Sequence, residues 1–586
     1  MSLASRTVGK FSLVWIASFA YLYAVYSPAA SIPYAHHDQY RYFVEDDHSP
    51  DAFKADRTND PQWSWLRALG RPVAAELEHQ VFKRVRVMQD LVPLRAFGVG
   101  LAATAMAILV FHLLYLKASP ILAFCVAGAI YTLPAVQFSV FMTSFNHPVA
   151  QILALLGAFF IRLGSRPLAH GWAMSKCIQA MAKCLQWAAC YGVAVCLLVV
   201  AQMSYAPSAF VALLPMGAEI VFKGPAGWAS SRRHLLRDTV VVAASCLIYF
   251  AIIKTYYFQP GAVSVAAYQM KINHDLLNRF GLLVFDVGKS VLNFWNVLYP
   301  TEAFALGAVG FLISGACLVL VRQLAGSRCR TGRTVCSARF SNWLQMVCGL
   351  AFLMVFSEAT YLAAPVPMSL YRMHFASTAM AVLLMVGAAI SWGRLLNKPW
   401  RRTVSCALVS TLLCGCGLFA HWSVLMNCLN SQMEFSFVAS QIAAHASDRI
   451  CRIHVVKPGS TARSYNGLPV VRGDEFNVAS TNYDLDIPWL VRAALCNVFD
   501  CASFTVKPVP HTRDGIAASG DPAVIAVTAS AADEPVIPSL GAVIIDMNDL
   551  LMLANSPKPP LTYRVKPYQA ISANPAQAPE MQLSAR

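Results

Sequence analysis

Several acidic residues in the first polar stretch of the chain could take part in proton transfer. An apolar segment at about 11–30 is followed by His36, His37, Asp38 and Arg41, and then by Glu45, Asp46, Asp47 and His48. A carboxylate at the water end of a membrane helix can reach a cavity between helices, where low dielectric raises its basicity. Asp38 is therefore the best-placed candidate catalytic acid, with Asp46 and Asp47 as further candidates. The alternative for all of these acids, Asp38 included, is a solvated charge run.

Basic residues that could hold a phosphate occur at several separate places in the sequence. A guanidinium group donates bidentate hydrogen bonds to phosphate oxygens and keeps its charge. Arg71, in the run Gly70-Arg71-Pro72, could alternatively mark a helix start at which it meets lipid headgroups. Arg372 opposes the charge bias expected on its side of the membrane, so it requires a phosphate or a carboxylate such as Glu358. The candidate phosphate-binding residues are Arg41, Arg71, Arg372 and Lys271.

The histidines do not show the spacing of a metal site. Hydrogen bonding or packing at the membrane interface is the better interpretation of His36, His37, His147 and His374. We therefore predict neither a bound metal nor a cofactor.

The composition places these residues on a membrane protein. Of the 586 residues, 57% are hydrophobic and 13% are charged, whereas soluble domains are about 45–50% apolar and about 25% charged. The excess forms stretches of roughly 17–25 residues, the length that a helix needs to cross a bilayer. The net charge of +16 resides mostly in short connectors. It therefore indicates an oriented membrane protein, not a nucleic-acid-binding one.

The apolar stretches predict about eleven transmembrane helices, and the basic connectors predict their orientation. A cleaved signal peptide is the alternative for the first stretch, but its apolar core is longer than usual. Lys and Arg mark every second connector, so the N-terminus is expected in the cytoplasm and the region after Met426 outside, in the periplasm of a Gram-negative cell. The predicted spans lie near 11–30, 94–116, 119–141, 147–163, 185–204, 207–222, 239–257, 302–322, 343–363, 376–393 and 403–425.

We predict a transmembrane domain at 1–425, a small C-terminal α/β domain at 426–565 and a flexible tail at 566–586. The transmembrane domain includes two long outer loops, 31–92 and 258–300. Strands are expected at 453–456, 523–527 and 542–545, and a helix at 487–498. The outer placement permits a disulfide between Cys496 and Cys501, or between Cys451 and either of them.

Short motifs in the first 120 residues resemble a family of membrane enzymes. His37-Asp38 with Arg41, then Gly70-Arg71-Pro72, then Gln89-Asp90 with Pro93 before the second span, are similar to the Gtr-type glucosyltransferases of bacteria and their phages, within the GT-C class. Weaker echoes lie at Gln202–Tyr205 and at Tyr371-Arg372. Family members usually carry paired acids where this chain has His37-Asp38.

The resemblance implies transfer of a sugar, such as glucose, from a polyprenyl-phosphate donor to an outer glycan or lipid acceptor such as O-antigen. We expect Asp38 to act as general base, and Arg71, Arg372 and Arg41 to hold the carrier phosphate. The implied partners are the lipid-linked donor, the acceptor and the bilayer, and no nucleic acid. The alternatives are a lipid or polysaccharide transporter or flippase, which usually has ionisable residues deep in its spans or two similar halves, and a non-catalytic assembly protein.

Overall fold

The computed structural model describes the helical part of the chain and a small sheet. Its described residues are 3–36, 39–42, 66–67, 70–82, 85, 88–165, 176–257, 276–283, 291, 309–310, 312–321, 333–363, 371–393, 398–445, 452–457, 480, 487–498, 505–508, 524–530, 542–547 and 549–550. Contacts divide the chain into two units. The first unit comprises Met1–Pro33, Asp56–Leu425 and Arg472–Asp474, and the second comprises Tyr34–Ala55, Met426–Val471 and Glu475–Arg586.

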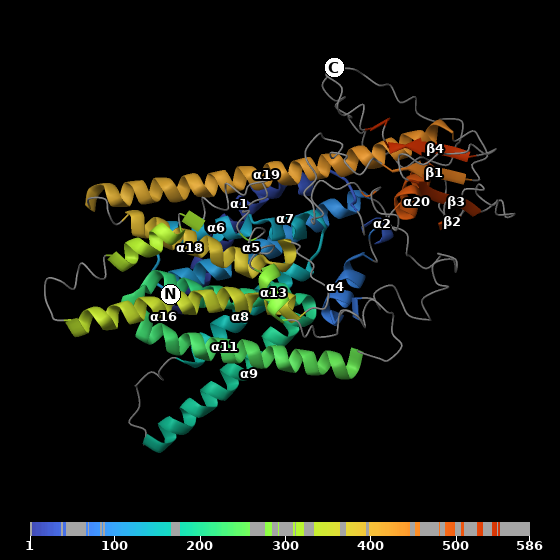
Figure 1. Ribbon diagram of the computed structural model, residues 1–586. Helices are drawn as coiled ribbons and strands as arrows, with labels where there is room; N and C mark the ends of the chain where they lie inside the picture. Colours follow the sequence, from blue (N-terminus) through green and yellow to red (C-terminus); the bar gives the residue numbers. More distant parts are fainter. Residues whose placement is uncertain are drawn as a thin grey trace. The chain divides into compact units, whose positions relative to one another are not determined.

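The first long helix is packed into the helical unit. Helix α1 (Leu3–Ser31) runs against α5 (Leu91–Tyr115), and the indole Nε1 of Trp15 donates a hydrogen bond to Thr104 Oγ1 at 2.9 Å. Near its other end, the Tyr26 hydroxyl donates to the carbonyl oxygen of Tyr131 at 2.7 Å. Helix α1 is therefore held by polar contacts at its middle and near its C-terminal end, as well as by packing against α5; Figure 1 shows the arrangement of these helices.

A proline divides the next apolar segment into two helices. Helix α6 (Pro120–Tyr131) and helix α7 (Pro134–Phe141) are together long and apolar enough for a membrane span, but they meet at an angle of 61°. Pro134 opens α7, where its missing N–H costs nothing. The predicted span at 119–141 is thus a bent pair, either a broken span or a re-entrant loop.

Two helical segments, α9 and then η2 with α10, pack along helix α8 (Asn146–Gly164) before the chain reaches α11. In α9 (Lys176–Ala209), Gln186 donates to the carbonyl oxygen of Leu163, and Ser204 donates to that of Asn146. Helix α9 therefore runs antiparallel to α8. The chain then passes through η2 (Phe210–Leu213) into α10 (Leu214–Lys223), where Arg162 near the end of α8 donates to the carbonyl oxygen of Pro215 at 2.7 Å.

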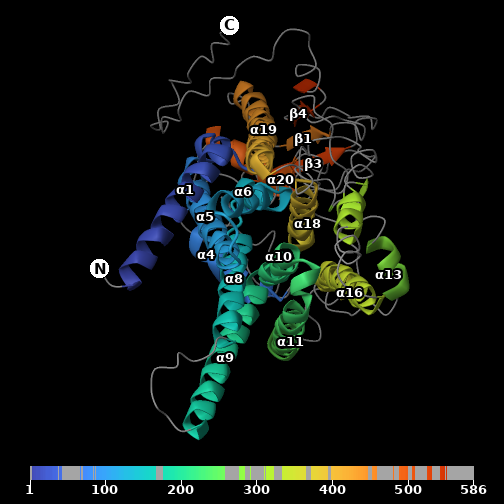
Figure 2. The same ribbon diagram turned by 90° about the vertical axis from the view of Figure 1, so that its left-hand side faces the viewer.

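The reversal lies at Tyr205, whose φ of −156° and ψ of 99° interrupt the helix. Pro207 follows two residues later and has no N–H to continue the helical ladder. Met181–Lys223 forms one helical stretch of 43 residues, but the break at Tyr205 divides it into two arms that run in opposite directions along α8. These arms contain the two segments predicted as separate spans, 185–204 and 207–222. The first turns of α9 extend past the neighbouring helices (Figure 1, Figure 2).

The remaining helices surround this group. After η3 (Pro225–Gly227) and α11 (Trp228–Ile252), the chain continues into a π-helical turn, η4 (Ile253–Tyr257). Helices α10, α11, α16 and α18 contact one another. The later described elements of the first unit are α13 (Leu276–Leu282), α16 (Arg333–Ser357), α17 (Ala359–Ala363), η7 (Tyr371–Met373), α18 (Phe375–Gly393) and the part of α19 (Lys398–Ala444) up to Leu425.

The helix lengths and their apolar composition identify a multi-pass membrane protein. In the part of the chain that the structure describes, seven helices are long and apolar enough to cross a membrane, or eight if the bent pair is one span. The predicted span at 302–322 lies partly outside the described residues, where a shorter apolar helix covers Leu312–Val321. The predicted span at 403–425 lies within α19.

The second unit contains a parallel sheet of four strands. The strand order is β2-β3-β1-β4, formed by β1 (Arg452–Val456), β2 (Thr505–Pro508), β3 (Val524–Ser530) and β4 (Ala542–Asp546). Helix α20 (Ile487–Val498) contacts β2 and β3 and buries an apolar face that includes Leu490 and Val491. Cys496 at its end is disulfide-bonded. Its two candidate partners, Cys451 and Cys501, lie outside the described residues.

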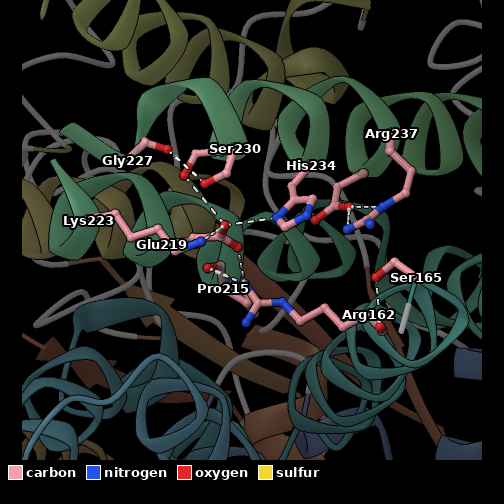
Figure 3. A network of polar contacts seen from close by, with 11 residues as sticks. Arg162, Ser165, Pro215, Glu219, Lys223, Gly227, Ser230, His234 and Arg237 are labelled. Atoms are coloured by element: carbon pink, nitrogen blue, oxygen red, sulfur yellow. Dashed lines mark hydrogen bonds and ion pairs between the residues drawn. The ribbon is translucent and has the colours of Figure 1, made fainter. Parts of the chain in front are cut away.

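A buried carboxylate joins α8, α10 and α11 at the end of α8 that carries Arg162 (Figure 3). Glu219 is 4% exposed and is contacted by Lys223 Nζ at 2.7 Å, by His234 Nδ1 at 2.8 Å and by Arg162 at 3.4 Å. Ser231 also donates to it. In this low-dielectric position, each charge depends on the others for compensation.

We predict that Glu219→Ala strongly destabilises the protein. The substitution leaves the buried guanidinium of Arg162 without this counter-charge, and breaking a buried ion pair from one side costs about 3–5 kcal/mol. Thermal unfolding in nanodiscs measures the loss. Arg67→Ala is the matched control, because Arg67 and Glu76 form an exposed pair at 3.8 Å that is worth about 0–1 kcal/mol. Equal unfolding temperatures for the two variants would contradict a stabilising role for the network.

Candidate functional site

The site begins at Arg71, in the turn that precedes α4 (Pro72–Phe82). Gly70 has a positive φ of 77°, a conformation that glycine adopts without steric cost. The turn is closed by a hydrogen bond from the Arg71 N–H to the carbonyl oxygen of Leu66, at 2.9 Å. In addition, the Tyr249 hydroxyl of α11 donates to the carbonyl oxygen of Gly70 at 3.0 Å. Pro72 then opens the helix, so Arg71 occupies a position fixed from both sides.

The side chain of Arg71 lies on an aromatic ring at the break in α9. The guanidinium carbon is 4.7 Å from the ring centroid of Tyr205, and Tyr205 itself is only 3% exposed. The Tyr205 ring also lies 3.9 Å from the ring of His147, at the beginning of α8. His147 Nδ1 is 3.3 Å from the Ser208 hydroxyl. The reversal of the chain at Tyr205 therefore presents one ring to both Arg71 and His147.

Arg372 approaches the same rings from a distant part of the sequence. Its guanidinium carbon lies 4.6 Å from the ring centroid of Phe138 in α7, and the rings of Phe138 and His147 are 6.1 Å apart. The positive charges of Arg71 and Arg372 both act on His147. The result is a series of side chains in contact, which we call the arginine–aromatic cluster: Arg71, Tyr205, His147, Phe138 and Arg372.

This cluster has the chemistry of an anion site. A guanidinium group that stacks on a ring uses its flat face, whereas its N–H donors lie in the plane and point past the ring. Two guanidinium cations lie close enough to the buried His147 for their charges to act on it, and charges interact more strongly away from water. A phosphate group placed between their donors would compensate this charge with bidentate hydrogen bonds.

Glu358, the predicted carboxylate partner of Arg372, has other contacts. His374 Nδ1 lies 2.8 Å from its Oε2, and the Ser377 hydroxyl donates to its Oε1. All three residues are at most 2% exposed, and the ring of Tyr361 packs edge-on against that of His374. The Glu358 carboxylate thus anchors the beginning of α18, directly after Arg372.

The other predicted site residues are not placed by the structure. Asp38, Asp46, Asp47 and Lys271 lie outside the described residues, and Arg41 lies in α2 (Gln39–Tyr42) but its side chain is not described. Two neighbours of Asp38 are described, both within the second unit. His36 Nδ1 lies 2.9 Å from the Ser431 hydroxyl, and the ring of Tyr40 stacks on that of Phe435. His36 and Tyr40 therefore both contact the part of α19 that belongs to the second unit.

The structure thus brings together two of the four predicted phosphate-binding residues and adds aromatic residues that sequence reasoning did not select. His147 was predicted to serve in hydrogen bonding or packing, and it does both. Phe138 and Tyr249 lie within apolar runs that gave no signal.

Arg95 is completely buried in α5, where its Nε donates to Thr143 Oγ1 at 3.1 Å. Pro207 was the available signal that α9 ends near Tyr205.

No family model matches the chain, and no curated protein matches its sequence.

We predict that the contact between Arg71 and Tyr205 is energetically coupled. A double-mutant cycle with Arg71→Ala and Tyr205→Leu should give a coupling of about 0.5–2 kcal/mol in the free energy of unfolding, the usual range for a cation–π contact. Tyr205→Phe is the matched control, because it keeps the ring and should retain the coupling. Additive effects of the first two substitutions would show that the stacking contributes nothing.

Proposed function

We propose that the chain is a membrane glycosyltransferase that moves a sugar from a polyprenyl-phosphate donor to an extracytoplasmic glycan or lipid. The observation that carries the proposal is the convergence of Arg71 and Arg372 on one group of rings. These residues lie about 300 positions apart in the sequence. Arg71 lies within the predicted outer loop 31–92, and Arg372 lies just before the predicted span at 376–393. A lipid-linked phosphate is the anion that such a site, at the end of membrane helices, could select from the bilayer.

The proposed topology has eleven spans, a cytoplasmic N-terminus and a C-terminal domain in the periplasm. The disulfide at Cys496 supports this placement, because disulfides persist in oxidising compartments and are rare in the cytosol. The Lys- and Arg-rich connectors support it independently. The proposed fold is accordingly of the GT-C type, with the arginine–aromatic cluster on the outer side.

In the proposed reaction, the carboxylate of Asp38 takes the proton of an acceptor hydroxyl group. The acceptor oxygen forms a bond to the anomeric carbon as the bond from that carbon to the phosphate oxygen breaks, and the electron pair leaves with the phosphate. Arg71 and Arg372 stabilise the negative charge that develops on the leaving oxygen. Asp46, Asp47, Arg41 and Lys271 remain further candidates for these two roles.

A transporter or flippase is the alternative, and buried ionisable residues in apolar helices favour it. Glu219, Arg162 and Asp238 are each at most 8% exposed, as in many substrate and ion pathways. However, Lys223 and His234 in the same network have side chains about 40% and 38% exposed, and the network lies at the ends of α8 and α10. This position favours an anchor for the helix ends over a pathway through the bilayer.

We predict that Arg71→Ala and Arg372→Ala each raise the KM for a polyprenyl-phosphate sugar. Loss of hydrogen bonds to a charged group costs about 1.5–3 kcal/mol, which corresponds to roughly 10-fold to 100-fold in affinity. Transfer by the purified protein in nanodiscs measures the effect. Arg67→Ala is the control, since Arg67 lies one turn away and pairs with Glu76 at the surface. If Arg71→Ala and Arg372→Ala keep the original KM, as the control Arg67→Ala should, the proposed phosphate site is wrong.

We further predict that Asp38→Asn reduces the rate of transfer by roughly 10²–10⁴-fold, the usual contribution of a general base. Binding of the donor should be unchanged, because asparagine keeps the size of the side chain and removes only its ability to accept the proton. Single-turnover transfer and donor binding are measured on the same preparation. Full activity in a folded Asp38→Asn protein would exclude Asp38 as the base.

A further inference from the structure

A second acidic residue, Glu78, is buried close to the arginine–aromatic cluster. It lies in α4, seven positions after Arg71, and is 6% exposed. The buried positions of this helix are Ala74, Ala75, Glu78 and Phe82, a spacing that places Glu78 on the face that packs inward. Helix α4 contacts both α8 and α9. The carboxylate is thus directed toward the helices that carry His147 and Tyr205.

The Glu78 carboxylate connects α4 to the first residue of α8. Asn146 Nδ2 donates a hydrogen bond to Glu78 Oε1, and the carbonyl oxygen of Asn146 accepts a hydrogen bond from the Ser204 hydroxyl at 3.1 Å. The residue after Ser204 is Tyr205, on which Arg71 stacks. Arg71 is therefore connected to Asn146 by two routes. One runs along α4 to Glu78, and the other runs through Tyr205 and Ser204.

We propose that Glu78 is a positioning residue that fixes Arg71 in the phosphate site through its hydrogen bond with Asn146. The inference rests on the proposed function of Arg71. Helix α4 has only 11 residues, and a helix of that length is marginal without tertiary contacts. The turn at Gly70 anchors one end of the helix and Glu78 anchors it two turns later. Together they set its rotation and height, and hence the place from which the Arg71 side chain extends.

A direct part in proton transfer is the rival role for Glu78. The conservative substitution Glu78→Gln distinguishes a positioning role from a role in proton transfer. In Glu78→Gln, the amide oxygen can still accept from Asn146, but the side chain can no longer take a proton. Glu78→Ala removes both abilities, and Asn146→Ala removes the donor while leaving the carboxylate in place.

The test measures binding of polyprenyl monophosphate to the full-length protein in nanodiscs, with polyprenol as the ligand that lacks the phosphate. Glu78→Ala and Asn146→Ala should each raise the Kd for the phosphate by roughly 10-fold to 100-fold, the loss expected for one hydrogen bond to a charged group. Glu78→Gln should stay within about threefold of the unmodified protein. Glu76→Ala, an exposed position on the same helix, should have no effect, and no variant should alter the weak binding of polyprenol.

A double variant shows whether Glu78 acts through Arg71. If it does, adding Glu78→Ala to Arg71→Ala causes no further loss of affinity, because the two positions share one interaction with the ligand. Independent, multiplicative losses would overturn the inference. So would normal binding by Glu78→Ala, or loss of transfer in Glu78→Gln with binding intact. If Arg71→Ala itself leaves binding unchanged, the proposed phosphate site fails, and that outcome is distinct from the others.

Discussion

The contact between Arg71 and Tyr205 is the interaction on which the candidate site depends. Arginine charges close to a low-dielectric helix bundle would repel one another and lose hydration. The electron-rich ring faces of Tyr205 and Phe138 compensate part of this cost. Tyr205 can serve in this way because α9 breaks at this residue and the chain turns back along α8. A continuous helix would carry the following residues away from Asn146 instead of back toward Arg162.

The two ends of α8 are fixed by different chemistry. At one end, Glu219 collects the charges of Arg162, Lys223 and His234, and so ties three helices together. At the other end, Asn146 and His147 take part in hydrogen bonds and ring contacts near two arginines. Compensated charges thus hold the scaffold at the first end, whereas the second end carries the arginine–aromatic cluster of the proposed phosphate site. A site built on a rigid helix such as α8 keeps its geometry better than a site on a loop.

The sequence predicted a helical multi-pass membrane protein, because apolar stretches of spanning length are local signals, and the described part of the chain contains seven or eight candidate membrane helices against the eleven spans predicted. It also singled out Arg71 and Arg372 individually as candidates for phosphate binding, from the type of side chain that phosphate requires. It could not predict that they share one group of rings, since Phe138 and His147 belong to ordinary apolar helices and their role arises from packing. The contacts of Glu358 with His374 and Ser377 could not be predicted for the same reason, because they arise from packing. Glu78 gave no signal, because a single acid in a polar loop resembles a solvated residue until its burial is known.

The most direct test of the central claim is a cryo-EM structure of the protein in nanodiscs that contain polyprenyl monophosphate. We expect the phosphate group between the guanidinium groups of Arg71 and Arg372, within about 2.7–3.2 Å of donors from both, with the isoprenoid chain leading into the bilayer. A phosphate bound elsewhere, with both arginines still stacked on their rings and distant from it, would contradict this account.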